Sequence, residues 1–200
     1  MDEIIENTTT KEKIIEATLA IIANEGFQNI TIRKIATMAG VNVGAVNYHF
    51  GSKEKVLNEA LEHVMIQMKK IFNCLKDNGK TPEERLEVFI QKYLKTLFKY
   101  PDPVKNLIHQ SIHEHGVTNS YQEYLKNEGI ELIKNTIHEI KSDEGEAVLV
   151  MRTIQLLGSM AFPVLLGKRA VDIFGMDVNK PENQRIYADL LVQYTDYRIN

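Results

Sequence analysis

Residues 31–50, TIRKIATMAGVNVGAVNYHF, have the composition and spacing of a helix-turn-helix that could contact DNA. Two short helical patterns flank Gly40, which permits a tight turn between them. In the second pattern Val46 and Phe50 are spaced to face inward, and the outer positions before Tyr48 carry small and amide side chains. Small residues let a helix enter the major groove, where amides and methyl groups contact base edges. The pattern therefore indicates duplex recognition.

The charge distribution agrees with this interpretation. Residues 31–55 contain Arg33, Lys34, Lys53 and Lys55 but only one acidic residue, although the whole chain has a formal net charge of −3. A basic patch on an acidic body suits a protein that binds duplex DNA at one end. The alternative is an ordinary solvated helical face, because glycine-turned helix pairs also occur in proteins that do not bind DNA.

These residues resemble the TetR family of bacterial transcriptional regulators. The resemblance covers residues 10–60 and lies in Gly26-Phe27, Thr31 to Ala36, Ala39-Gly40-Val41, Tyr48-His49-Phe50, Ser52-Lys53-Glu54 and Leu57. Many members have tyrosine where this chain has Asn47, which leaves open the bases that are contacted. The resemblance implies a DNA-binding domain in residues 1–52 and a ligand-binding and dimerisation domain in residues 53–200.

The resemblance also implies which side chains contact DNA. Those expected near base edges are Asn42, Val43, Ala45 and Asn47, with Gly44 allowing close approach of the backbone. Those expected on phosphates are Thr31, Arg33, Tyr48, His49 and Lys53. Thr31 and Lys53 lie at helix starts, whose free amides favour an anion. Phe50 is expected only to pack, and Tyr48 to combine packing with DNA contact.

The elements that must position these residues are helices. Helix-start signals such as Thr9-x-x-Glu12 and Thr81-Pro82-Glu83-Glu84 recur, and strand-like alternation is scarce. We expect an all-α protein with a three-helix N-terminal head and a larger helical body. The expected helices span residues 10–25, 32–39, 43–49, 53–77, 82–99, 103–115, 120–141, 144–168 and 180–198.

Two helices near the C-terminus are apolar around much of their circumference. We expect them to form a symmetric four-helix interface in a homodimer. The residues expected there are Met151, Ile154, Gln155, Gly158, Phe162, Ile186, Leu190 and Tyr194. The alternative is an ordinary internal core. A twofold dimer would present two reading helices about 34–36 Å apart to a pseudo-palindromic operator.

The middle helices carry aromatic, methionine and histidine side chains that could line a pocket for a small, mostly apolar effector. The set is Met65, Met68, Phe72, Phe89, Tyr93, Leu97, Phe98, His109, Ile112, His113, Tyr121 and Tyr124. Plain core is the alternative for each residue, and the family resemblance favours the pocket for the set. We expect such an effector to shift helix 53–77 and release a repressor from its operator.

Other function classes have weaker support. His109 and His113 are four residues apart, a spacing that can bind a metal, but no third ligand is evident. The chain lacks a Gly-rich phosphate loop, a nucleophile elbow and a persuasive pair of catalytic carboxylates. We therefore expect no enzyme and no cofactor. A metal-binding or enzymatic protein centred on these histidines, or a transcriptional activator, remains the alternative.

The composition bounds the setting of the protein. It is 44% hydrophobic and 26% charged, which excludes a disordered or low-complexity chain. No window approaches 18 uninterrupted apolar residues, and the acidic N-terminus is unlike a targeting peptide. Cys74 is the single cysteine, so no internal disulfide can form. We expect a cytoplasmic protein in a reducing compartment, without a membrane partner.

Overall fold

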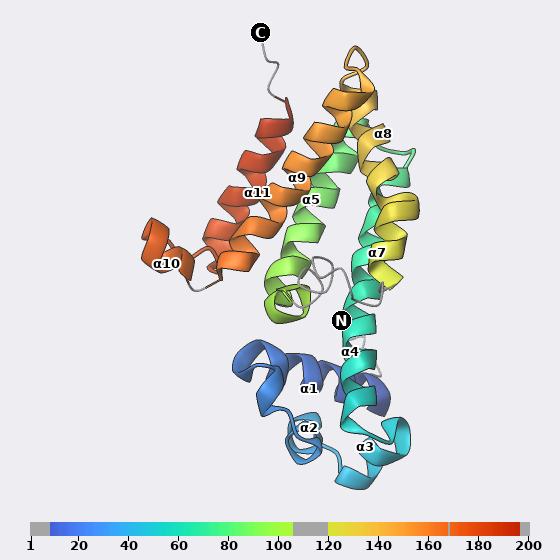
Figure 1. Cartoon of the computed structure of the whole chain (residues 1–200), viewed down its shortest axis with the longest axis vertical. Coiled ribbons are helices and arrows are strands. Elements are labelled where there is room, and N and C mark those ends of the chain that lie inside the picture. Colours follow the sequence, from blue (N-terminus) through green and yellow to red (C-terminus); the bar gives the residue numbers. More distant parts are fainter. Residues whose placement is uncertain (1–8, 106–119, 168, 197–200) are drawn as a thin grey trace, which may run out of the picture. The chain divides into compact units, whose positions relative to one another are not determined.

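The computed structural model describes residues 9–105, 120–167 and 169–196, which contain helices and no β-strand. The all-α fold class expected from the sequence is confirmed. The chain divides into two compact units, Met1–Val64 and Met65–Asn200. The helices of both units are labelled in Figure 1.

The first unit contains three helices and the beginning of a fourth. They are α1 (Thr10–Glu25), α2 (Ile32–Ala39), α3 (Val43–Phe50) and α4 (Lys53–Ile71), with the 3₁₀ turn η1 (Phe27–Asn29) after α1. The predicted capping box starts α1, because the Thr9 hydroxyl accepts from the Glu12 amide and the Glu12 carboxylate accepts from the Thr9 amide. Ile14, Ile35 and Val46 are fully buried and supply core contacts from α1, α2 and α3.

The division between the units falls inside α4, later than the predicted boundary after residue 52. The first part of α4 carries three fully buried side chains at four-residue spacing, Val56, Ala60 and Val64. Residues at this spacing share one helical face. The first half of α4 is therefore part of the first unit.

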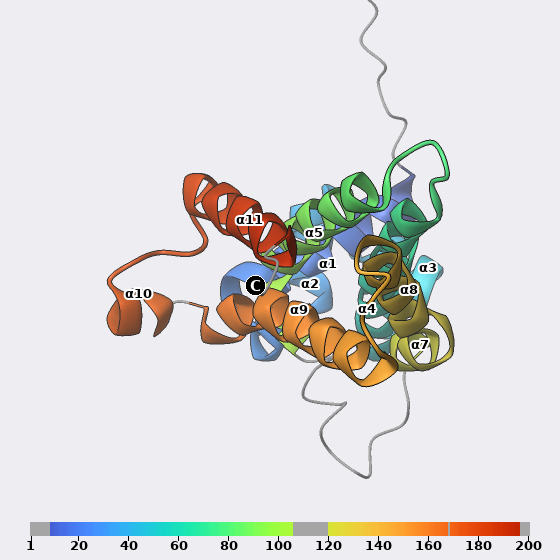
Figure 2. The ribbon, with the colours of Figure 1, turned by 90° about the horizontal axis from the view of Figure 1, so that it is seen from above.

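The second unit is built around α5 (Pro82–Lys99), which packs against α8 (Ile130–Ile140), α9 (Glu146–Leu166) and α11 (Pro181–Asp196). The remaining elements are the 3₁₀ segment η2 (Phe72–Lys76), α7 (Ser120–Tyr124), the π-helical turn η3 (Leu125–Gly129) and α10 (Arg169–Phe174). Figures 1 and 2 show α10 set apart from α5, α9 and α11.

The sequence pattern misses three details of the helices. The predicted helix 53–77 is α-helical only to Ile71 and then tightens into η2. The predicted helix 120–141 contains the π turn η3, and α10 has no counterpart among the expected spans. Most of the predicted helix 103–115 lies outside the described residues.

Helix α9 is the one helix in the described ranges long and apolar enough to cross a membrane, with a mean hydropathy of 1.6 over its best 18-residue window. Core helices of soluble proteins meet the same criterion. Length and composition therefore do not by themselves assign α9 to a membrane.

Candidate nucleic-acid interface and associated surfaces

The α2–α3 pair has the turn geometry of a helix-turn-helix. The Thr31 hydroxyl caps α2 by accepting from the Lys34 amide at 3.2 Å. Gly40 ends α2 in the left-handed region with φ 66°, which favours glycine. The Asn42 side chain then caps α3 by accepting from the Ala45 amide at 2.7 Å. Each of these local roles follows from the residue type expected at that position.

The two faces of α3 separate as expected. Val46 and Phe50 are buried, whereas Val43, Gly44, Asn47, Tyr48 and His49 are exposed and Ala45 is half-buried. Tyr48 is 86% exposed, and its ring contacts that of His49 at a centroid distance of 5.3 Å. The core-packing part of the mixed role expected for Tyr48 is therefore wrong. Its ring is available to a molecule outside the chain.

Asn42, the N-cap of α3, and Gly44 also have a structural role at the start of this helix. The Asn42 Oδ1 atom is engaged by the Ala45 amide. A Cβ atom at Gly44 would lie 3.1 Å from that same oxygen, which is closer than ordinary contact. Gly44 therefore leaves room for the cap as well as for a close approach from outside.

Two helix N-termini of this unit each carry a cation without an ion pair in the described residues. Thr31 precedes α2 and Ser52 precedes α4, where the Ser52 hydroxyl accepts from the Lys55 amide at 3.3 Å. Exposed Arg33 and half-buried Lys53 have no ion pair within the described residues. Free amides and positive side chains at helix starts favour a phosphate oxygen.

Two other cations of the unit form ion pairs. Lys34 forms an ion pair with Glu25, the last residue of α1. Lys11 pairs with Glu59 at 2.7 Å and lies 5.7 Å from the Phe50 ring centroid. These contacts connect α1 to α2, α3 and α4 within the first unit.

Residues 14–60, which hold this helix-turn-helix, match the protein family described as "Bacterial regulatory proteins, tetR family". The chain therefore carries the N-terminal domain of TetR-family regulators. It is 26% identical over 145 residues to the HTH-type transcriptional repressor NicS of Pseudomonas putida, covering 72% of this chain and 61% of NicS. It is 34% identical over 104 residues to the HTH-type regulator YerO of Bacillus subtilis, covering 51% of this chain and 36% of YerO. The chain covers less than two thirds of the length of either relative.

Solved TetR structures share the fold over nearly the whole chain. A TetR regulator from Legionella pneumophila superposes with a TM-score of 0.62 at 16% identity, covering 96% of this chain and 98% of the other. A TerR/AcrR-family regulator from Aquifex aeolicus superposes with a TM-score of 0.61 at 20% identity, covering 93% and 97%. At these identities the similarity establishes the fold of the second unit and not what it binds.

Most of the residues expected to contact an effector are buried in the second unit. Phe72 lies 4.9 Å from Phe89, 6.0 Å from Tyr93 and 5.3 Å from Tyr124, measured between ring centroids. Met65, Met68 and Leu97 are also buried. His109, Ile112 and His113, and with them the alternative metal site, lie outside the described residues.

Tyr93 also forms a hydrogen bond that the sequence pattern does not predict. Its hydroxyl lies 2.6 Å from the Tyr121 hydroxyl, and both side chains are buried. Burial raises the pKa of Tyr93 to about 12 and that of Tyr121 well above its ordinary value. Both phenols are therefore neutral at physiological pH, and a neutral phenol can donate a hydrogen bond to an uncharged polar group or accept one from it.

Phe72, Phe89, Tyr93 and Tyr124 form an aromatic cluster, and the π turn η3 packs against it. The Ile130 amide donates to the Leu125 carbonyl, five residues earlier, as a π-helix requires. A Cβ atom on buried Gly129 would lie 3.1 Å from Phe72 Cε1 and 3.3 Å from Tyr124 Cε1. Glycine at this position therefore lets the helix approach the Phe72 ring closely.

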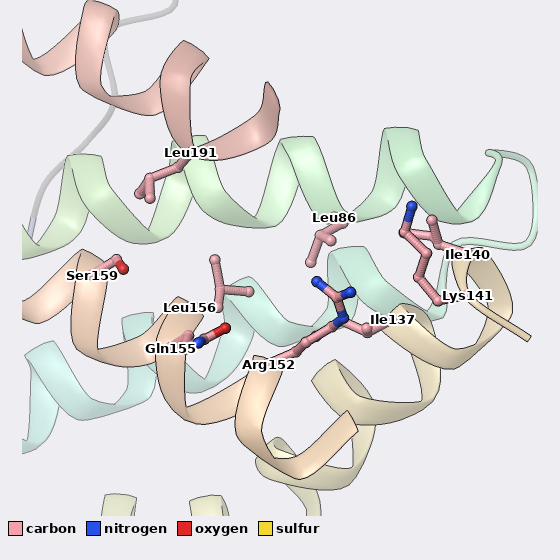
Figure 3. A pocket seen from close by; sticks show the side chains of 9 residues that line it. All are labelled: Leu86, Ile137, Ile140, Lys141, Arg152, Gln155, Leu156, Ser159 and Leu191. Atoms are coloured by element: carbon pink, nitrogen blue, oxygen red, sulfur yellow. The ribbon is translucent and has the colours of Figure 1, made fainter. Parts of the chain in front are cut away.

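Two hollows of the second unit lie elsewhere. One is a cavity of about 20 Å³, room for a single water molecule. Its lining, drawn in Figure 3, comprises Leu86, Ile137, Ile140, Lys141, Arg152, Gln155, Leu156, Ser159 and Leu191. The other is an open groove of about 560 Å³ between α5 and α11, with Leu94, Phe98 and Ala188 among its lining residues. Of the residues expected to line an effector pocket, Phe98 alone borders either hollow.

The apolar residues expected at a dimer interface are exposed in the single chain. Met151 is 59%, Ile154 58% and Phe162 54% exposed on α9, and Ile186 and Leu190 are both 56% exposed on α11. Gln155 and Gly158 are exposed as well, and the side chain of Tyr194 lies outside the described part. The alternative of an ordinary internal core is wrong for these exposed positions, because the chain does not cover them itself.

Proposed function

We propose that this TetR regulator is a repressor that binds a pseudo-palindromic operator as a homodimer and is released by a small, mostly apolar effector. The observation that carries the proposal is the exposed face of α3, together with unpaired Arg33 and Lys53 at the N-termini of α2 and α4, the helices before and after α3 in the chain. Phosphate contacts from these cations would position α3, and Asn47 would contact base edges. NicS is named as a repressor, which supports repression rather than activation by this chain.

The homodimer is supported by the exposed apolar faces of α9 and α11. Contiguous exposed apolar side chains of this kind usually mark an interaction surface. Burial against a second copy accounts for them without a membrane, since the described part of α9 also carries Arg152, paired with Glu144. A repressor of this kind would act on DNA in the cytoplasm.

Effector release is supported by the path of α4. This helix begins at Lys53, proposed as a phosphate contact, and its later residues Met65 and Met68 lead to Phe72 in the aromatic cluster. An effector that binds the cluster better in one position of α4 would favour that position. A coupling free energy of about 1–3 kcal/mol would lower DNA affinity about 5- to 150-fold.

Selection of random duplexes on the purified protein tests the DNA-binding proposal. We expect enrichment of an inverted repeat. Lys53→Ala should weaken binding to all duplexes evenly and lower the salt slope by about one unit, whereas Asn47→Ala should change which sites are enriched. Lys13→Ala removes the same charge from an exposed position on α1 and serves as the control.

Two results would contradict these assignments. Failure to enrich any inverted repeat argues against operator binding by a dimer. An unchanged site preference in Asn47→Ala shows that Asn47 does not contact base edges. Placing the enriched site upstream of a reporter gene then distinguishes a repressor from an activator by the sign of the response.

A further inference from the structure

Glu25 holds one of the cations beside the proposed phosphate contacts. It forms an ion pair with Lys34, which is adjacent in sequence to unpaired Arg33. We propose that Glu25 limits the DNA affinity of the first unit by holding the Lys34 ammonium that would otherwise contact a phosphate. This inference rests on the proposed binding of DNA.

Both partners of the ion pair are attached to well-defined helix ends. The Glu25 carbonyl accepts a hydrogen bond from Asn29 Nδ2 at 2.5 Å, and Gly26 follows with φ 82°. Lys34 lies in the first turn of α2, where its amide donates to the Thr31 hydroxyl. The carboxylate of Glu25 is therefore delivered to the helix start at which Thr31 and Arg33 are proposed to hold phosphate.

A carboxylate in this place opposes DNA binding because it competes with phosphate for the Lys34 ammonium. The side chains of Lys34 and Glu25 are 39% and 38% exposed, so Lys34 can exchange Glu25 for another anion without unfolding. Because phosphate contacts carry no sequence information, the effect should be the same for every duplex.

An affinity limit matters for a regulator that must be released. Effector coupling of the usual size weakens binding only about 5- to 150-fold. A DNA-binding unit with one more phosphate contact would bind all DNA more tightly. It would remain bound to DNA even after an effector had weakened its affinity by this factor. Glu25 would keep the affinity within the range that an effector can reverse.

The test compares four proteins: wild type, Glu25→Gln, Lys34→Ala and the double variant. Binding to a pool of random-sequence duplexes is measured by fluorescence anisotropy over a series of KCl concentrations. We expect Glu25→Gln to bind several-fold more tightly at low salt, with a salt slope steeper by about one unit per head. The gain should disappear when Lys34 is also replaced, since the two substitutions then act on one interaction.

Glu16→Gln is the matched control, because Glu16 is an exposed acidic residue of α1 that has no ion pair within the described residues. An equal gain in this control, or a gain from Glu25→Gln that persists without Lys34, overturns the inference in favour of a general charge effect. No gain from Glu25→Gln in a folded protein also overturns it. Absence of binding by the wild type instead overturns the proposed DNA binding itself.

Discussion

Burial of the Tyr93 and Tyr121 phenols makes the second unit less stable at alkaline pH. Both phenols titrate near pH 10 in an unfolded chain, whereas burial raises the pKa of Tyr93 to about 12 in the folded protein. Above about pH 10 the unfolded state therefore loses a proton that the folded state keeps. The stabilisation is complete below the unfolded pKa and is lost as the pH rises toward the folded pKa.

We expect the free energy of unfolding to fall by about 2 kcal/mol for Tyr93 between about pH 9 and pH 12. Tyr93→Phe should show a shallower decline, at a cost of about 1 kcal/mol at neutral pH for the lost hydrogen bond. Urea unfolding at several pH values measures both effects. Tyr48→Phe is the control, because this phenol is 86% exposed, and a parallel decline in all three proteins would refute the assignment.

At the scale of elements, the cap of α3 can be separated from the proposed reading of bases. Asn42→Ala should lower the free energy of unfolding by about 1 kcal/mol, because it removes the acceptor for the Ala45 amide. Asn42→Asp keeps an acceptor and should preserve stability while weakening duplex binding through its negative charge. Thermal unfolding and duplex titration of both variants provide the measurements. Equal stability of the alanine variant would show that the cap contributes nothing.

Helix ends were the most predictable part of the fold because capping is local. Thr9, Thr31, Asn42 and Thr81 each accept from an amide three residues later, as their residue types predict. Helical periodicity could not predict the π turn. The turn brings Tyr124 and Gly129, which are five residues apart in the chain, to the same Phe72 ring. The short helix α10 was missed because most of its apolar side chains are exposed.

The site itself was predictable to different degrees. The local pattern around Gly40 was enough to identify the exposed face of α3. The Glu25–Lys34 and Tyr93–Tyr121 contacts join separate elements, so they depend on packing that no short pattern contains. The sequence pattern grouped Phe72 with its aromatic partners, but the distances between the rings depend on how the helices pack.

For the whole molecule, the exposed faces of α9 and α11 predict a dimer in solution. Ile154→Lys and Leu190→Lys each place a charge on a side chain that is more than half exposed in the single chain. We expect each to raise the dimer dissociation constant at least about 10-fold, because a central apolar contact is lost and a charge is buried. Analytical ultracentrifugation measures this constant.

Ile66→Lys is the matched control for the dimer, since Ile66 is 42% exposed on α4 and is not part of the proposed interface. It should leave the association unchanged. A wild-type protein that sediments as a monomer at every concentration would contradict the dimer. Operator affinity should fall together with dimerisation, because each protomer then contributes a single half-site contact.

The chain contains no tryptophan, and Tyr48 is the one tyrosine among residues 1–64. Its ring lies almost entirely in solvent, whereas Tyr93 and Tyr121 are enclosed by the protein. Incorporation of fluorotyrosine would therefore give one ¹⁹F resonance from the DNA-binding unit, assignable through Tyr48→Phe. A single labelled sample could then report contact with an operator and occupancy of the interior as separate spectral changes.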